Sequence, residues 1–183
     1  MKAKSIILNS ASLVTAFYFG SVVVSVFLVP DDILTNSAIL KLLVGGVSVI
    51  ARGIIRIETY SVFPEVFSFL YAVMISVVPI LVLVYLRAIK ISELSVLTSA
   101  EKRKLLVVSG ISVLFFSMLA IIAIVIVPGD PSGMGWTSKI ARTMLFTKWG
   151  FSLWGCVLTV GMASSIALAI VSAKVLVRLI NWK

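Results

Sequence analysis

Long apolar runs dominate the chain, and four of them are long enough to cross a lipid bilayer. A transmembrane helix needs about 20 apolar residues to cross a hydrocarbon core of about 30 Å. The four runs cover residues 5–29, 63–86, 105–127 and 151–173, and most charged residues lie between them. The pattern predicts an all-α integral membrane protein in which residues 1–183 form a single membrane domain with four transmembrane helices.

A further apolar segment, residues 39–60, differs from these runs because it carries Lys41, Arg52, Arg56 and Glu58. Only ten uncharged residues separate Lys41 from Arg52, which is about half of a membrane span. Each charge placed near the centre of a span costs about 2.5–3.5 kcal/mol even on a lenient insertion scale. We therefore expect this segment to lie on the membrane rather than cross it.

Helical periodicity gives the same segment two faces. At 100° per residue, one stripe is polar and basic and the opposite stripe is aliphatic. This predicts an amphipathic helix over residues 39–57, broken or softened at Gly45–Gly46 and Gly53, with its basic stripe towards water and lipid headgroups. A re-entrant hairpin bent at Gly45–Gly46 is the alternative. The polar stripe holds Lys41, Gly45, Ser48, Arg52, Arg56 and Thr59, and the aliphatic one holds Leu43, Val47, Ile50, Ile54 and Ile57.

Four spans place both termini on the same side of the membrane. Ten of the 16 Lys and Arg residues fall on the side of the termini, and the positive-inside rule makes that side cytoplasmic. We expect a bacterial inner-membrane protein whose connections 30–62 and 128–150 face outwards. The second connection predicts a short helix that Thr137 caps and Phe146 ends. Three tryptophans are expected at the interfaces, Trp149 and Trp154 outside and Trp182 inside.

Composition narrows the possible chemistry. The chain is 61% hydrophobic and 13% charged, with a mean hydropathy of +1.20, far from values for soluble domains. Its net charge of +9 is expected to meet lipid headgroups rather than nucleic acid. There is no histidine and one cysteine, Cys156, so the usual general base and metal ligands are missing. With no hydrolase, zinc-protease or phosphate-loop motif in the sequence, we expect no enzyme and no cofactor.

Three features within the predicted spans invite a functional reading. Glu65 follows Pro64 in the first turn of its helix, where a carboxylate complements the helix dipole, although an ion relay is the alternative. Pro79 predicts a kink, or alternatively a gating hinge. Small residues recur at four-residue spacing in the last span and favour close helix contact, within this bundle or with a second protein. One small-residue row holds Gly161, Ser165 and Ala169, and the other holds Ala163 and Ala167.

Four stretches carry a resemblance to a known family. They are "SVFLVPDD", "TYSVFPEVFSFLYAVMISVVPILVLVYLRAIK", "SAEKRKLL" and "KVLVRLINWK". In layout and character the chain resembles the immunity proteins that protect bacteria against pore-forming colicins of the A, B, N and U group. Those are inner-membrane proteins of similar length with four spans, cytoplasmic termini and sizeable periplasmic loops. The resemblance covers nearly the whole chain as topology.

The resemblance implies a function without catalysis, in which the protein binds and blocks the pore-forming domain of a bacteriocin within the membrane. The residues that geometry nominates as partner contacts are Lys41, Arg52 and Arg56 outside the membrane, and Gly161 and Ser165 within it. Two other functions remain open. One is an exclusion protein of a conjugative plasmid or phage, and the other is an accessory subunit of a larger membrane complex.

Overall fold

The computed structural model describes residues 2–51, 53–89, 99–126 and 131–181. These residues form helices and no strand, which confirms the predicted all-α class. The helices are α1 (Lys2–Leu28), α2 (Ala38–Ser48), α3 (Gly53–Tyr60), α4 (Pro64–Ala88), α5 (Ser99–Ile126), α6 (Trp136–Phe146) and α7 (Lys148–Ile180).

Four of these helices, α1, α4, α5 and α7, are long and apolar enough to cross a membrane, and they coincide with the four predicted spans. Their sequences explain this, because each is rich in aliphatic residues with charges near its ends. At 1.5 Å per residue, the 33 residues of α7 reach about 50 Å, so this helix extends beyond a hydrocarbon core of about 30 Å. The chain is thus a multi-pass membrane protein.

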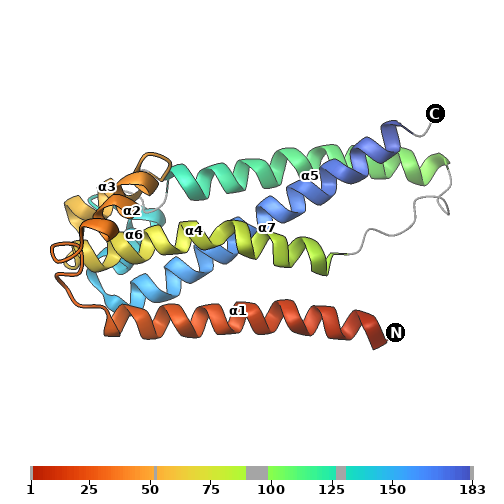
Figure 1. Cartoon of the computed structure of the whole chain (residues 1–183). Helices are drawn as coiled ribbons and strands as arrows, with labels where there is room; N and C mark the ends of the chain where they lie inside the picture. The colour runs from red at the N-terminus through yellow and green to blue at the C-terminus, as the bar shows by residue number, and fades with distance from the viewer. Residues whose placement is uncertain (1, 52, 90–98, 127–130, 182–183) are drawn as a thin grey trace.

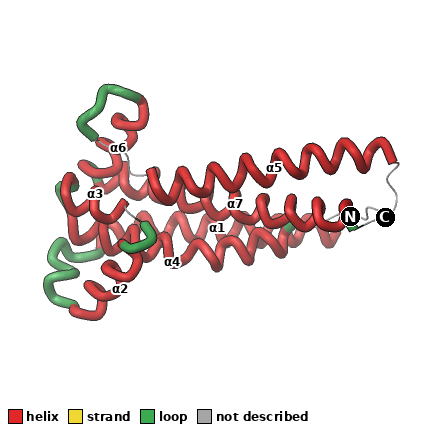
Figure 2. Tube along the Cα trace, turned by 90° about the horizontal axis from the view of Figure 1, so that it is seen from above, coloured by secondary structure: helices red, strands yellow, loops and turns green. Residues whose placement is uncertain are grey.

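Helix α7 lies at the centre of the arrangement. It packs against α1, α4 and α5, whereas α5 has its main contact with α7 alone. Viewed from above, α5 and α4 lie on opposite sides of the molecule (Figure 2). The rings of Phe67 on α4 and Phe151 on α7 stack with their centroids 4.2 Å apart. The buried core therefore runs along α1, α4 and α7, and α5 lies beside it.

The three short helices form a cap at one end of the long ones. In Figure 1, α2, α3 and α6 gather at the left, while α1 begins and α7 ends at the right. Figure 2 places α2 on the α4 side of this cap and α6 on the α5 side. Both long connections thus belong to the end opposite the termini, which is the arrangement that an even number of crossings requires.

The segment predicted as a helix over residues 39–57 forms two helices, α2 and α3, and the interruption ends at Gly53, one of the points where the sequence predicts a break or a softening. The break lies after Ser48, where the backbone N–H groups of Ile50 and Ala51 both donate to the carbonyl of Val47. Helix α2 continues through Gly45–Gly46, so the alternative of a hairpin bent there is wrong. A helical glycine costs only about 1 kcal/mol. Ala51, Gly53 and Ile54, which follow the break, are buried.

The ends of two other helices also differ from expectation. Helix α6 takes Gly135 as its N-cap, so the capping role predicted for Thr137 is wrong. Helix α7 begins with a side-chain cap that the sequence analysis does not predict, in which the Gly150 N–H donates to the Thr147 hydroxyl at 2.9 Å.

Helix α4 runs without interruption through Pro79. There the Ser76 hydroxyl donates to the carbonyl of Ala72 at 2.8 Å, one turn before the proline.

The junction of α6 and α7 leaves no room for a side chain at Gly150. A Cβ atom added there would lie 2.0 Å from the carbonyl oxygen of Thr143. We expect Gly150→Ala to destabilise the protein by at least about 1–3 kcal/mol, the usual cost of overpacking. Thermal unfolding of the detergent-solubilised protein measures this loss.

Gly161→Ala is the matched control, because no atom lies within 4 Å of a Cβ added at Gly161. Its effect should stay within about 0.5 kcal/mol. Equal unfolding temperatures for the two variants would contradict the packing seen at the junction.

Candidate functional site

Glu65 fastens the first connection to the start of α4. Its Oε2 atom accepts hydrogen bonds from the backbone N–H groups of Leu34 and Thr35, both at 2.8 Å. Its Oε1 atom accepts from the Thr35 hydroxyl. These three bonds give the carboxylate a structural role, but through a segment about 30 residues earlier in the chain rather than through its own helix.

A second fastening joins the same connection to the start of α7. The Lys148 ammonium lies 3.2 Å from the Asp31 carboxylate and 4.8 Å from the centre of the Phe63 ring. The rings of Phe27 and Trp149 pack with centroids 5.0 Å apart. The aromatic residue predicted at the outer interface thus lies at the cap end and also holds α1 against α7.

Helix α6 is joined to the rest of the cap by its last turn. The Ser61 hydroxyl and the Val62 N–H both donate to the carbonyl of Leu145, at 3.0 and 3.2 Å. The rings of Trp136 on α6 and Trp154 on α7 meet edge to face, 6.3 Å apart. Every short helix is therefore held to a long one, so the cap can present side chains in fixed positions.

The cap contains a pocket of about 410 Å³ between α2, α3 and the start of α4. Four of its residues recur at the three- and four-residue spacing of one face of α2. Lys41 and Glu58 are exposed, and neither forms an ion pair within the part of the chain that the structure describes. The pocket thus presents an ammonium group, a hydroxyl group and two carboxylates. It is lined by Leu34, Lys41, Val44, Gly45, Ser48, Glu58 and Glu65.

Of the charged residues predicted to contact a partner, Lys41 and Arg56 lie among the described residues, on two separate helices. Lys41 faces a pocket that it shares with Glu58 and Glu65. Arg52 lies outside the described residues. Arg56 is half-buried on α3 and interacts electrostatically with Tyr71 on α4. Glu58 lies off the stripe in a projection of one continuous helix, so the sequence does not predict that it lines the same pocket as Lys41.

The small-residue rows of α7 also divide. Ala163, Ser165 and Ala167 are buried, whereas Gly161 is exposed and has open space around it. Gly161 lies 13 residues after Lys148, about 20 Å along the helix. The predicted contact residues therefore fall into separate regions, with Lys41 and Arg56 in the cap and Gly161 near the middle of α7.

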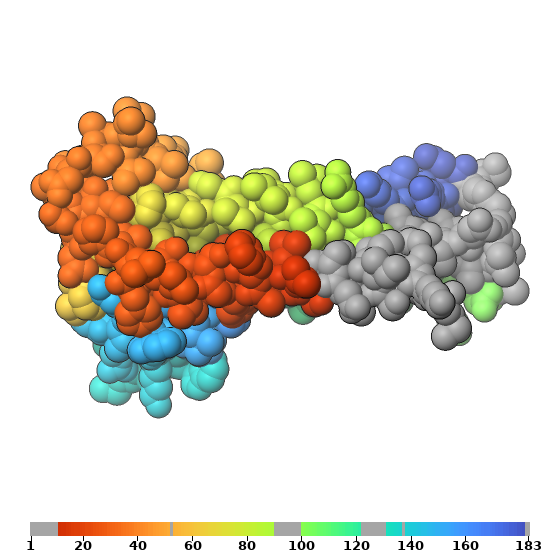
Figure 3. All heavy atoms as spheres, turned by 60° about the horizontal axis from the view of Figure 1, so that its bottom comes forward, coloured from red at the N-terminus to blue at the C-terminus, as the bar shows by residue number. Residues whose placement is uncertain are grey.

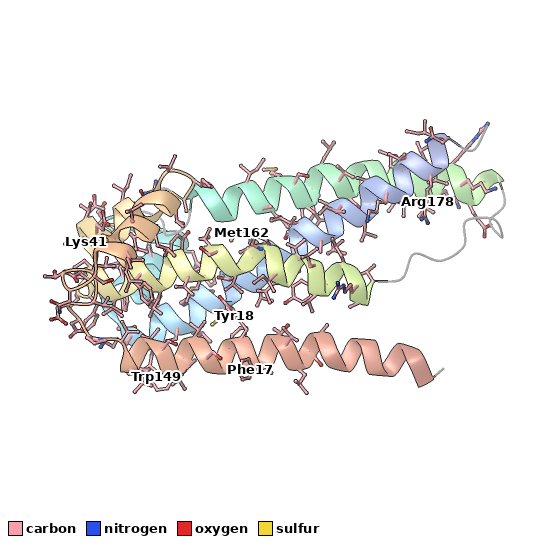
Figure 4. All side chains as sticks on the ribbon, in the orientation of Figure 1. Phe17, Tyr18, Lys41, Trp149, Met162 and Arg178 are labelled. Atoms are coloured by element: carbon pink, nitrogen blue, oxygen red, sulfur yellow. The ribbon has the colours of Figure 1, made fainter. Side chains whose placement is uncertain are left out.

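Helix α1 has one face that packs against the other long helices and one face that points away from them. In Figure 4, Tyr18 points towards α4 and α7 while Phe17 points away from them. Tyr18 is buried and Phe17 is 76% exposed. The Thr15 and Tyr85 hydroxyls lie 3.0 Å apart and link α1 to α4. Outward residues such as Phe17 are the ones that meet lipid tails when the helix crosses a membrane.

Comparisons of the chain with protein-family models, with curated proteins and with solved structures found no match. Within the described ranges, no three His, Cys, Asp or Glu side chains are grouped so that they could hold a metal ion. Any function therefore has to be argued from two surfaces, the pocket of the cap and the open face of α7.

The hydrogen bonds of Glu65 predict a local effect of mutation. Glu65→Ala removes the acceptors for three donors and should increase proteolytic cleavage within residues 30–37 severalfold. Glu65→Gln keeps one carbonyl acceptor and should fall between Glu65→Ala and the unmodified protein. Limited proteolysis in detergent, followed by mass spectrometry of the fragments, measures the rates.

The control is Glu58→Gln, because the Glu58 carboxylate has no hydrogen-bond partner among the described residues. Its cleavage rate should match that of the unmodified protein. If Glu65→Ala were cleaved no faster than this control, Glu65 would not be what holds the first connection.

Proposed function

We propose that this protein is a bacterial inner-membrane immunity protein that binds a pore-forming bacteriocin within the membrane and blocks its channel. Four candidate membrane spans support this, as does the separation of the cap from the end where α1 begins and α7 ends. A toxin that enters from outside would meet the cap first and the membrane helices afterwards. The protein would act by occupying the toxin's helices, with no catalytic step.

The observation that carries the proposal is the open face near the middle of α7. Leu153 and Val157 are 56% and 44% exposed, and Gly161 follows them at the same four-residue spacing with nothing near its missing side chain. Helices in lipid associate by van der Waals packing at small residues, where two backbones can approach closely. A hydrophobic helix of the toxin can therefore pack across α7 at Gly161.

The cap supplies the surface for the first encounter. In Figure 3, the segments of α2 and α6 protrude on opposite sides of the bundle end. Lys139 and Arg142 on α6 are exposed, whereas Lys41 on α2 shares its pocket with two carboxylates. We assign electrostatic steering of an acidic toxin surface to α6 for this reason.

This proposal requires the cap to face the outside and both termini to face the cytoplasm. Alkaline phosphatase inserted at Met134, an exposed residue of the second connection, should be active, since the enzyme folds only outside. A fluorescent protein fused after Lys183 should fluoresce inside the cell. The reverse pattern would place the cap in the cytoplasm and remove the proposed encounter with a toxin.

Expression of the chain in sensitive bacteria should protect them against one member of a panel of pore-forming colicins. Survival and potassium efflux after addition of purified toxin measure the protection. Gly161→Leu fills the open face and should weaken protection. The highest toxin dose that the cells survive should fall about tenfold, which corresponds to a loss of about 1.4 kcal/mol in binding. Protein levels in the membrane should stay unchanged.

Gly20→Leu is the matched control, because Gly20 also has no atom near an added Cβ but lies on α1. It should leave protection intact. Equal losses in both variants would contradict a specific site on α7.

Two outcomes would favour the other functions. Absence of protection against the whole panel, together with reduced conjugation or phage entry, would favour an exclusion protein. A stoichiometric membrane partner without either effect would favour an accessory subunit.

A further inference from the structure

Helix α2 has two faces with opposite character. Ile39 and Leu42 are 79% and 78% exposed, and Ile50 just after the helix is also exposed. On the other side, Lys41, Gly45 and Ser48 line the pocket of the cap. Exposed aliphatic side chains on a membrane protein are accommodated by acyl chains, as in an interfacial amphipathic helix. The pocket side of α2 is thus polar, while its outer side suits lipid.

The position of Glu65 indicates the level at which the pocket lies in the membrane. This residue lies in the first turn of α4, a helix long and apolar enough to cross the membrane. The first turn of such a helix lies where the hydrocarbon core meets the headgroups. Since Glu65 lines the pocket, the pocket opens at the level of the lipid headgroups.

The charges of the pocket match a group that carries both signs. Lys41 offers an ammonium to a phosphate, and Glu58 offers a carboxylate to an amine. Glu65 already accepts three hydrogen bonds, which leaves Glu58 as the carboxylate without a partner among the described residues. Two carboxylates beside one ammonium disfavour a purely anionic ligand. The volume of about 410 Å³ falls within the usual range of small-ligand pockets, roughly 300–1,000 Å³.

We propose that this pocket binds the phosphoethanolamine headgroup of a zwitterionic phospholipid, with Lys41 on the phosphate and Glu58 on the ammonium group. The acyl chains would lie against the exposed aliphatic face of α2. A primary ammonium donates hydrogen bonds to Glu58, whereas the quaternary ammonium of phosphocholine has no N–H group to donate. The site should therefore distinguish these two zwitterions. This inference does not rest on the proposed immunity function.

The test uses the full chain in nanodiscs that contain equal parts of dioleoyl phosphatidylethanolamine, phosphatidylcholine and phosphatidylglycerol. Native mass spectrometry measures which lipid stays bound. We expect phosphatidylethanolamine to be retained about tenfold over phosphatidylcholine, roughly the value of one charge-assisted hydrogen bond. Glu58→Gln should abolish this preference, and Lys41→Met should reduce retention of both zwitterions.

Lys139→Met is the matched control, since Lys139 is an exposed lysine of the cap that does not line the pocket. It should retain lipid as the unmodified protein does. Equal retention of the two zwitterions, or preferred retention of phosphatidylglycerol that survives Glu58→Gln, would overturn the proposal. So would thermal stabilisation of the lipid-free protein by soluble O-phosphoethanolamine as strong as that by the phospholipid, because the ligand would then be the soluble ester.

Discussion

The structure depends on one constraint, that a backbone crossing a hydrocarbon core must satisfy its hydrogen bonds within its own helix. The same constraint separates the chain into two kinds of segment. Four long helices contain almost all of the apolar sequence, and the polar contacts of Glu65, Asp31 and Lys148 lie at their cap end. Several hydroxyl groups within the spans donate to carbonyls of their own helices, as Thr159 does to the carbonyl of Gly155 at 2.8 Å and Ser76 does to that of Ala72.

The position of α7 among the other helices explains why part of its surface stays open. Its small residues are used on the side that faces the bundle, where a Cβ added at Gly155 would lie 2.9 Å from the Met74 side chain of α4. Helices α1 and α5 both pack against α7 and have no extensive contact with each other in the described part of the chain. A central helix with neighbours on only part of its circumference keeps one face for lipid or for another helix. Gly161 lies on that face.

The sequence predicted the spans well because a long apolar run is a local signal that tertiary contacts seldom override. It failed where distant residues decide the outcome. The chain turns between Ser48 and Gly53, where Ala51 and Gly53 are buried; the sequence marks Gly53 as a weak point, but a helical projection does not predict the direction of the turn. Thr35 meets Glu65 across 30 residues and Asp31 meets Lys148 across 117. No spacing rule predicts either pair, so the sequence draws attention to Lys41 and Glu65 one by one but does not predict the pocket that both of them line.

Charge is distributed differently at the two ends of the molecule, and this difference bears on the pocket of the cap. Arg87, Lys174 and Arg178 lie towards the end of the termini, and their positive charge attracts anionic lipid there. In the cap, carboxylates offset the basic residues, since Asp31 pairs with Lys148 and Glu58 shares a pocket with Lys41. A pocket that holds carboxylates beside its ammonium can select a zwitterionic headgroup where a basic patch would collect any anion. No residue of α7 lines the pocket, so a bound lipid would anchor the cap without covering the open face.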